Sequence, residues 1–119
     1  MYQILEELNK TSGITGSMVV GSDGIVIAAD LNTVYEEETI GALAASIMSN
    51  INKSMERLDS SPLVQVTIEA DNAKMFFCEA GIGVLVVVAE PNVNIGLVRL
   101  EIKHAITQLN TKKAAIENK

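Results

Sequence analysis

Apolar residues recur along the chain with two different spacings, which separate expected helices from expected strands. Spacings of three and four residues, typical of a helix with one buried face, fill the segments 2–10, 36–58 and 93–110. Alternating or continuous apolar positions, typical of strands, fill the segments 16–21, 25–30, 63–69, 73–79 and 82–89. The last of these strands is almost entirely apolar, so we expect it at the centre of a sheet that is covered on both faces.

The connections between neighbouring strands are short, which predicts hairpins. Ser22-Asp23-Gly24 is typical of a tight turn, because glycine readily adopts the positive φ that such turns require. Strands joined by hairpins pair antiparallel, and the helices must bury their apolar faces against the sheet. The sequence therefore predicts an α+β fold of order αββαβββα, with a five-stranded antiparallel sheet and helices on both faces. We expect one domain over residues 1–110 and a polar tail over residues 111–119.

The long helix lacks charges over most of its length. From Thr39 to Asn52 no residue is charged, although a helix with one face in water normally carries charges on that face. The helix either lies deep in its own domain or, as we favour, packs against something outside its own chain. Small residues at helical spacing let a second helix approach closely. They form a flank beside the apolar stripe expected in the core, which comprises Ile40, Ala44, Ile47, Ile51, Met55 and Leu58.

The strand 63–69 is expected at an edge of the sheet, because the long helix before it is a crossover connection. Natural edges are usually protected by lysine, proline or bulges, but this strand has only Pro62 at its entrance and no lysine within it. We expect a two-fold dimer that joins two such edges antiparallel, lays two long helices side by side and buries at least about 1,200 Å². The predicted dimer interface comprises the helix flank Gly41, Ala45, Met48 and Asn52 and the strand positions Val64, Val66 and Ile68.

Composition limits the classes of partner. Fifteen acidic against nine basic residues give a net charge of −6, and this balance argues against a nucleic-acid or anionic membrane surface. The apolar run Ile82–Ala89 is far shorter than the roughly 20 residues that cross a bilayer, so no membrane insertion is expected. The single cysteine forms no internal disulfide, and the first residues do not resemble a secretory signal, so we expect a cytoplasmic protein.

Few side chains could carry out catalysis. His104 is the only histidine and lies on the polar side of its helix, away from Ile102 and Ile106, so we expect it to be solvated. Cys78 lies in an apolar strand and is predicted to be a small buried side chain. One histidine and one cysteine cannot complete a zinc site of the usual ligand types, and no dinucleotide or P-loop motif is present. We therefore expect no catalytic residue, metal or cofactor, and thus no enzyme.

Four stretches of the sequence together resemble a known family. They are SGITG followed by MVV within residues 12–20, SDGIVIA at residues 22–28, the Ala-, Ser- and Gly-rich long helix, and NIGLVRLE at residues 94–101. In this order and spacing they resemble the Roadblock family, the dynein light-chain and GTPase-regulator domain that includes a bacterial gliding-motility regulator. The resemblance covers roughly residues 2–110 and implies a profilin-like fold.

The resemblance further implies a homodimer whose second helices together form a surface for a small Ras-like GTPase. The leading hypothesis is a non-enzymatic regulator or scaffold, which would order the switch loops of the GTPase rather than insert an arginine. The partner surface would use the exposed helix positions Glu38, Ala42, Ser49, Lys53 and Glu56.

Two other functions stay open. The chain could be a purely structural oligomerisation or cargo-adaptor subunit without a nucleotide-dependent partner. It could also sense a small ligand in a pocket of the sheet, although the sequence shows no convergent cluster of polar residues for this. Binding to a GTPase loaded with GTP or with GDP would separate the regulator from the structural subunit, because a regulator should discriminate between the two states.

Overall fold

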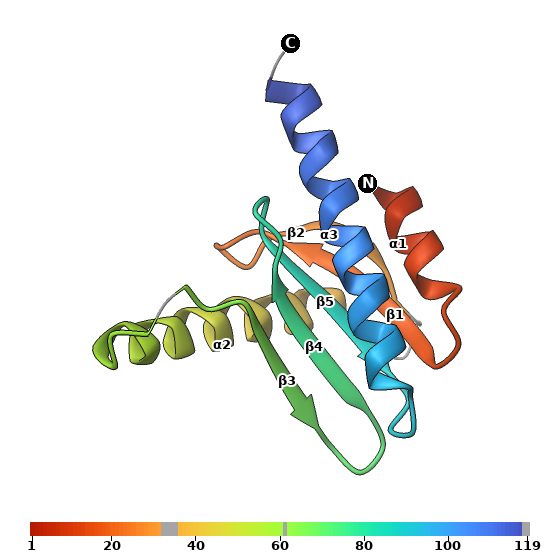
Figure 1. Ribbon diagram of the computed structural model, residues 1–119, viewed down its shortest axis with the longest axis horizontal. Coiled ribbons are helices and arrows are strands. Elements are labelled where there is room, and N and C mark those ends of the chain that lie inside the picture. Colours follow the sequence, from red (N-terminus) through yellow and green to blue (C-terminus); the bar gives the residue numbers. More distant parts are fainter. Residues whose placement is uncertain (32–35, 61, 118–119) are drawn as a thin grey trace.

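The computed structural model describes residues 1–31, 36–60 and 62–117 (Figure 1). Its elements follow one another in the predicted order, which confirms the αββαβββα arrangement and the α+β class. They are α1 (Tyr2–Asn9), β1 (Ile14–Val20), β2 (Val26–Asp30), α2 (Glu37–Arg57), β3 (Gln65–Glu69), β4 (Lys74–Glu79), β5 (Val84–Ala89) and α3 (Ile95–Glu117).

The five strands form one antiparallel sheet in the order β2-β1-β5-β4-β3. The apolar strand β5 lies at its centre and is buried at every residue, as its sequence predicts. The crossover through α2 leaves β3 at one edge, which is also as predicted, and β2 at the other. Gly24 adopts a φ of 87° in the β1–β2 turn, and this positive φ explains the glycine there.

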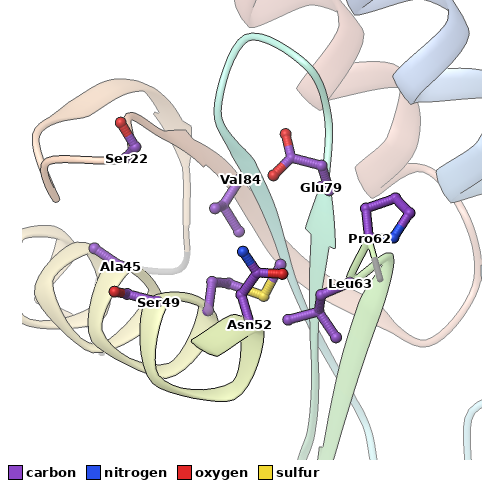
Figure 2. Close-up of a pocket in the computed structure, with 9 residues that line it drawn as sticks. Ser22, Ala45, Ser49, Asn52, Pro62, Leu63, Glu79 and Val84 are labelled. Atoms are coloured by element: carbon purple, nitrogen blue, oxygen red, sulfur yellow. The ribbon is translucent and has the colours of Figure 1, made fainter. Parts of the chain in front are cut away.

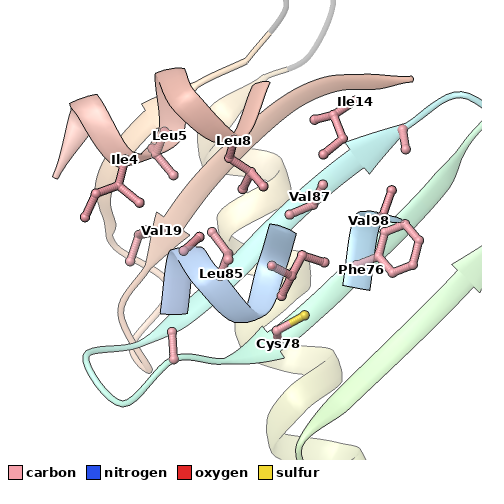
Figure 3. Close-up of a cluster of buried hydrophobic side chains, with 14 of the residues drawn as sticks. Ile4, Leu5, Leu8, Ile14, Val19, Phe76, Cys78, Leu85, Val87 and Val98 are labelled. Carbon is pink, nitrogen blue, oxygen red and sulfur yellow. The ribbon is translucent and has the colours of Figure 1, made fainter. Parts of the chain in front are cut away.

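Helices cover both faces of the sheet, so the molecule has two cores. The core shown in Figure 3 lies between the sheet and the pair α1 and α3, and its fully buried members include Leu5, Phe76 and Leu85. The second core lies beneath α2 on the opposite face and includes Met18 and Phe77. Neighbouring residues of one strand thus enter opposite cores, because side chains alternate across a sheet.

A short polar network fastens α1 to the first two strands. The Asn9 side-chain amide donates to the Asp30 carbonyl oxygen at 2.8 Å and to the Asp30 carboxylate at 2.9 Å. The fully buried Ser17 donates its hydroxyl to the Asn9 Oδ1 at 2.8 Å. These bonds satisfy polar groups that would otherwise be costly to bury, and they fix the position of α1 on the sheet.

The C-terminal end of the fold differs from the prediction. Residues 111–117 continue α3 past the predicted helix end at residue 110, while residues 118–119 lie outside the described residues. The predicted end relied on the loss of apolar periodicity after Leu109. That loss does not end a helix by itself, since this segment contains no glycine or proline and is rich in the good helix formers lysine and alanine.

The apolar stripe of α2 is buried over only part of its predicted length. Ile40, Ala44 and Met48 are buried against the sheet, but Leu58, directly after the helix, is 74% exposed. Figure 1 shows the reason, because the C-terminal half of α2 projects beyond β3 and therefore has no sheet of its own beneath it. The expectation that Leu58 lies in the protomer core is wrong.

Candidate functional site

The two side chains singled out for chemistry lie where a non-catalytic role would place them. Cys78 is buried, with its Sγ 3.5 Å from the Gln65 Oε1, and burial raises the pKa of its thiol to about 12. His104 is exposed, and its Nδ1 lies 4.0 Å from the Glu101 Oε1. Among the residues that the structure describes, no group of three or more His, Cys, Asp or Glu is arranged to hold a metal ion.

The buried thiol leads to a first prediction. With a pKa of about 12, roughly one thiol in 10⁴ is ionised at pH 8, whereas an unfolded cysteine is substantially ionised. Native protein should therefore react with a disulfide reagent at least ~100-fold more slowly than urea-unfolded protein. An exposed Ser49→Cys variant serves as the control and should react fast while folded. Equal rates for the native and unfolded wild-type chain would show that Cys78 is accessible.

The edge strand β3 presents unpaired backbone groups to solvent. The Val64 carbonyl accepts a hydrogen bond from the Glu79 N–H at 2.9 Å, and the Ala70 N–H donates to the Ala73 carbonyl at 2.9 Å. Residues of an antiparallel pair alternate between hydrogen-bonded and non-bonded positions. The even-numbered residues therefore bond to β4, and the N–H and C=O groups of Gln65, Thr67 and Glu69 point away from the sheet. The β3–β4 register contains no bulge that would protect this edge.

The three predicted strand positions lie on the face of the sheet that carries α2. Val66 and Ile68 are half-buried and pack against the core beneath α2, while Val64 is 68% exposed. The helix itself packs mainly against β1, β2 and β5. Part of the apolar surface of β3 and of the neighbouring Met75 in β4 therefore remains uncovered within one chain.

The predicted helix flank proves to face inward in part. Gly41 and Met48 are buried in the chain's own core, so within one chain they leave little surface for a second copy to contact. A Cβ atom at Gly41 would lie only 2.9 Å from the Gly24 carbonyl oxygen, because the β1–β2 turn docks on this flank. The spacing of the small residues predicts that something packs closely against this flank. In the structure, it is the β1–β2 turn of the same chain that does so.

The other two flank residues, Ala45 and Asn52, border a groove of about 380 Å³ between α2 and the sheet (Figure 2). Leu63 and Val84 form the opposite wall. The groove is thus on the side of α2 that faces the β1–β2 and β4–β5 turns, and its further lining residues are Ser22, Met48, Ser49, Pro62 and Glu79.

The opposite flank of α2 was not predicted from the sequence. Leu43 is 44% exposed and Leu58 is 74% exposed, and both are large and apolar. Three residues between them share this side at helical spacing. We call this stripe the second flank; it comprises Leu43, Ile47, Asn50, Ser54 and Leu58. The signal in the sequence is the helical spacing of Leu43 and Ile47, but the same periodicity assigns Ile47 and Leu58 to the predicted core stripe.

The outer face of α2 is exposed and short of charge in its middle. Its uncharged positions Ala42, Ser46 and Ser49 are all exposed, which rules out a helix sunk deep in its own domain. Charges occur toward the ends, with acids in the first turn and Arg57 in the last. The five predicted partner-binding positions are all exposed in the structure, namely Glu38, Ala42, Ser49, Lys53 and Glu56.

Sequence comparison finds relatives over most of the chain. Residues 1–89 match the Roadblock/LC7 domain. An uncharacterized protein of Methanocaldococcus jannaschii is 39% identical over 107 residues, which cover 90% of this chain and 94% of the relative. Within the parts of the chain that the structure describes, we find no helix with the length and apolar character needed to cross a membrane.

Two solved structures share the fold. The Roadblock/LC7 domain from Streptomyces avermitilis superposes with a TM-score of 0.88 at 20% identity, covering 96% of this chain and 98% of that one. MglB from Myxococcus xanthus superposes with a TM-score of 0.90 at 19% identity, covering 96% of this chain and 94% of that one. At such low identity these superpositions establish the common fold.

Proposed function

The chain belongs to the Roadblock/LC7 domain family, and we propose that it is a homodimeric regulator or scaffold that binds a small Ras-like GTPase. The observation that carries this proposal is the exposed outer face of α2, which carries no charge from Thr39 to Asn52, beside an unprotected sheet edge. The GTPase as the class of partner comes from the family resemblance of the sequence. The similarity of fold to MglB of Myxococcus xanthus is consistent with it.

The proposed dimer joins two β3 edges and covers the apolar surface that one chain leaves open. Val64, Val66 and Ile68 stay in this interface, because all three keep exposed surface on the α2 side of the edge strand. On the helix, the exposed Leu43 and Leu58 take the place of the inward-facing Gly41 and Met48. An interface of this kind is self-complementary, as a two-fold axis requires.

Two α2 helices side by side would present their outer faces as one platform for the GTPase. Ala42 and Ser49 give it small, uncharged side chains, and Lys53 and Glu56 add charged ones. The chain supplies no catalytic group in this proposal. It acts by contacting the switch loops of the GTPase, whose order depends on the bound nucleotide.

Nucleotide-dependent binding is the second prediction and the test of this function. We expect the dimer to bind a Ras-like GTPase of the same organism at least ~10-fold more tightly in one nucleotide state than in the other, measured by calorimetry. A Ser49→Arg variant, which places a bulky charge in the middle of the platform, should weaken this binding at least ~10-fold while the dimer mass stays unchanged. The matched control Gln108→Arg changes an exposed residue of α3 and should bind as wild type does.

The same experiment addresses the alternative function. A structural oligomerisation or cargo-adaptor subunit would use the same dimer but would not distinguish GTP-loaded from GDP-loaded partners. Equal affinity for both states, or no binding to any small GTPase of the organism, would favour that alternative over the regulator.

A further inference from the structure

We infer that the groove between α2 and the sheet is a binding site for a small organic cation, an ammonium or guanidinium group on a short apolar stem. The cationic group pairs with the Glu79 carboxylate, and the stem lies against Leu63 and Val84. The inference concerns a single chain and goes beyond the proposed function. Three features lead to it: the size of the groove, the charge of its lining and the position of Glu79.

The groove has the size and the lining of a small-molecule site. Its volume of about 380 Å³ is at the lower end of the range of ~300 to 1,000 Å³ that is typical of such sites, so it suits a small ligand. Figure 2 shows that the Leu63 side chain points into the groove. Five of the nine lining residues are apolar, namely Ala45, Met48, Pro62, Leu63 and Val84. An apolar stem therefore gains free energy when it leaves water for this wall.

The polar part of the lining favours cations over anions. It comprises Ser22, Ser49, Asn52 and Glu79, and none of the nine lining residues is basic. A phosphate, a nucleotide or a carboxylate would therefore meet a negative charge and no positive one. A cation meets a carboxylate beside an apolar wall, where opposite charges attract each other more strongly than in open water.

Glu79 is a carboxylate without a counter-ion. Side chains alternate along β4, so Glu79 follows Met75 and Phe77 on the face of the sheet that carries α2. Its Oε1 accepts a hydrogen bond from the Gly81 N–H at 2.9 Å, which holds the carboxylate at the β4–β5 turn. Among the described residues, no lysine, arginine or histidine nitrogen lies within 4.0 Å of it. The carboxylate can therefore pair with a cation from outside the chain.

Asn52 supplies a second polar group from the opposite wall. It is half-buried in α2, and Figure 2 shows its amide between the helix and Val84. The amide oxygen can accept a hydrogen bond from an ammonium or a guanidinium, since both carry several donors. Asn52 and Glu79 come from separate segments of the chain, which explains why the sequence shows no convergent cluster of polar residues.

The groove stays open in the proposed dimer. It lies on the side of α2 that faces the β1–β2 and β4–β5 turns, whereas the second flank, with Leu43 and Leu58, lies on the opposite side. Only Ser49 belongs both to the groove and to the predicted partner-binding positions. A ligand can therefore enter whether the chain is a monomer or a dimer, and failure of the test below would leave the proposed function in place.

Three matched probes test this site, and their binding to the full chain is the third prediction. Pentylamine, pentanol and pentanoate have the same number of carbon atoms and differ in the charge of the head group. We expect pentylamine to shift the NMR signals of the groove residues saturably, with a dissociation constant on the order of 1 to 10 mM for so small a ligand. Pentanol should bind at least ~5-fold more weakly, and pentanoate should not bind measurably, because only the amine can form the charged pair.

Three variants locate the charge. Glu79→Gln keeps an oxygen for the Gly81 N–H but removes the charge, so it should weaken pentylamine binding at least ~5-fold and leave pentanol binding unchanged. The matched control Glu90→Gln, beyond the other end of β5, should bind pentylamine as wild type does. It controls for a general attraction of amines to a chain of net charge −6. Asn52→Arg places a guanidinium on an aliphatic stem in the groove itself and should abolish pentylamine binding.

The possible outcomes decide the inference in either direction. Equal affinity for pentylamine and pentanol would overturn it, because the groove would then be apolar surface without a cation site. Equal weakening by Glu79→Gln and Glu90→Gln, or signals that shift only outside the groove, would overturn it as well. Circular dichroism checks that each variant is folded. Should Glu79→Gln fail to fold, Asn52→Arg and the three probes on the wild-type chain still decide.

Discussion

Replacing Gly83 by valine should destabilise the fold by at least about 3 kcal/mol. A Cβ atom at this position would collide with the carbonyl oxygen of Val20 and would lie 3.0 Å from its carbonyl carbon. Gly83 is in the turn between β4 and β5, where its own carbonyl accepts a hydrogen bond from the Ala80 N–H at 2.8 Å. Because the colliding atoms belong to the backbone of the inner strand β1, no side-chain rotation relieves the contact, and the turn or the strand must move.

The control for this substitution is Gly96→Ala, in the first turn of α3. A Cβ atom there meets only the Asn94 Oδ1, at 3.4 Å, and alanine favours helix over glycine by up to about 1 kcal/mol. This variant should therefore be as stable as wild type or more so. Urea unfolding at one fixed protein concentration checks both, because the stability of a dimer depends on concentration. A Gly83→Val unfolding midpoint equal to that of wild type would contradict the close packing of this turn on β1.

The sequence was sufficient to predict the sheet, because each strand carries its own local signal. The continuous apolar run at 82–89 placed a strand at the centre, and the crossover through the long helix placed the strand 63–69 at the edge. Both conclusions depend on pairing between neighbours in the chain. Such pairing can be inferred without knowing distances between remote segments.

The sequence could not show which flank of α2 is free. Periodicity shows that Gly41 and Met48 share one side and that Leu43 and Leu58 share another, but it contains nothing about how far the sheet extends beneath the helix. That extent is set by the number and order of the strands in the sheet that α2 covers. It also depends on the position of the β1–β2 turn, whose Gly24 lies against Gly41. Spacing alone therefore predicts an external contact for small residues that accommodate an internal one in the structure.

A Thr67→Pro variant should dissociate the proposed dimer while leaving the protomer folded. The N–H of Thr67 points away from β4, so proline removes no hydrogen bond within the chain, and edge strands are where proline is tolerated. In the dimer the same change removes one donor from each copy and leaves two carbonyl groups unpaired. At about 1 to 1.5 kcal/mol for each of the two lost bonds, the dissociation constant should rise roughly 30- to 150-fold.

Thr67→Val is the matched control, because it keeps the N–H and changes only the side chain, so its dimer should persist at the same dilution. Sedimentation equilibrium over a dilution series measures the association, and circular dichroism confirms that each variant is folded. If Thr67→Pro dissociates, it should also lose binding to the GTPase, since a platform built from two α2 helices exists only in the dimer. A monomeric but fully GTPase-binding Thr67→Pro variant would mean that one α2 is enough, and a dimer unaffected by proline would mean that the chains do not meet at β3.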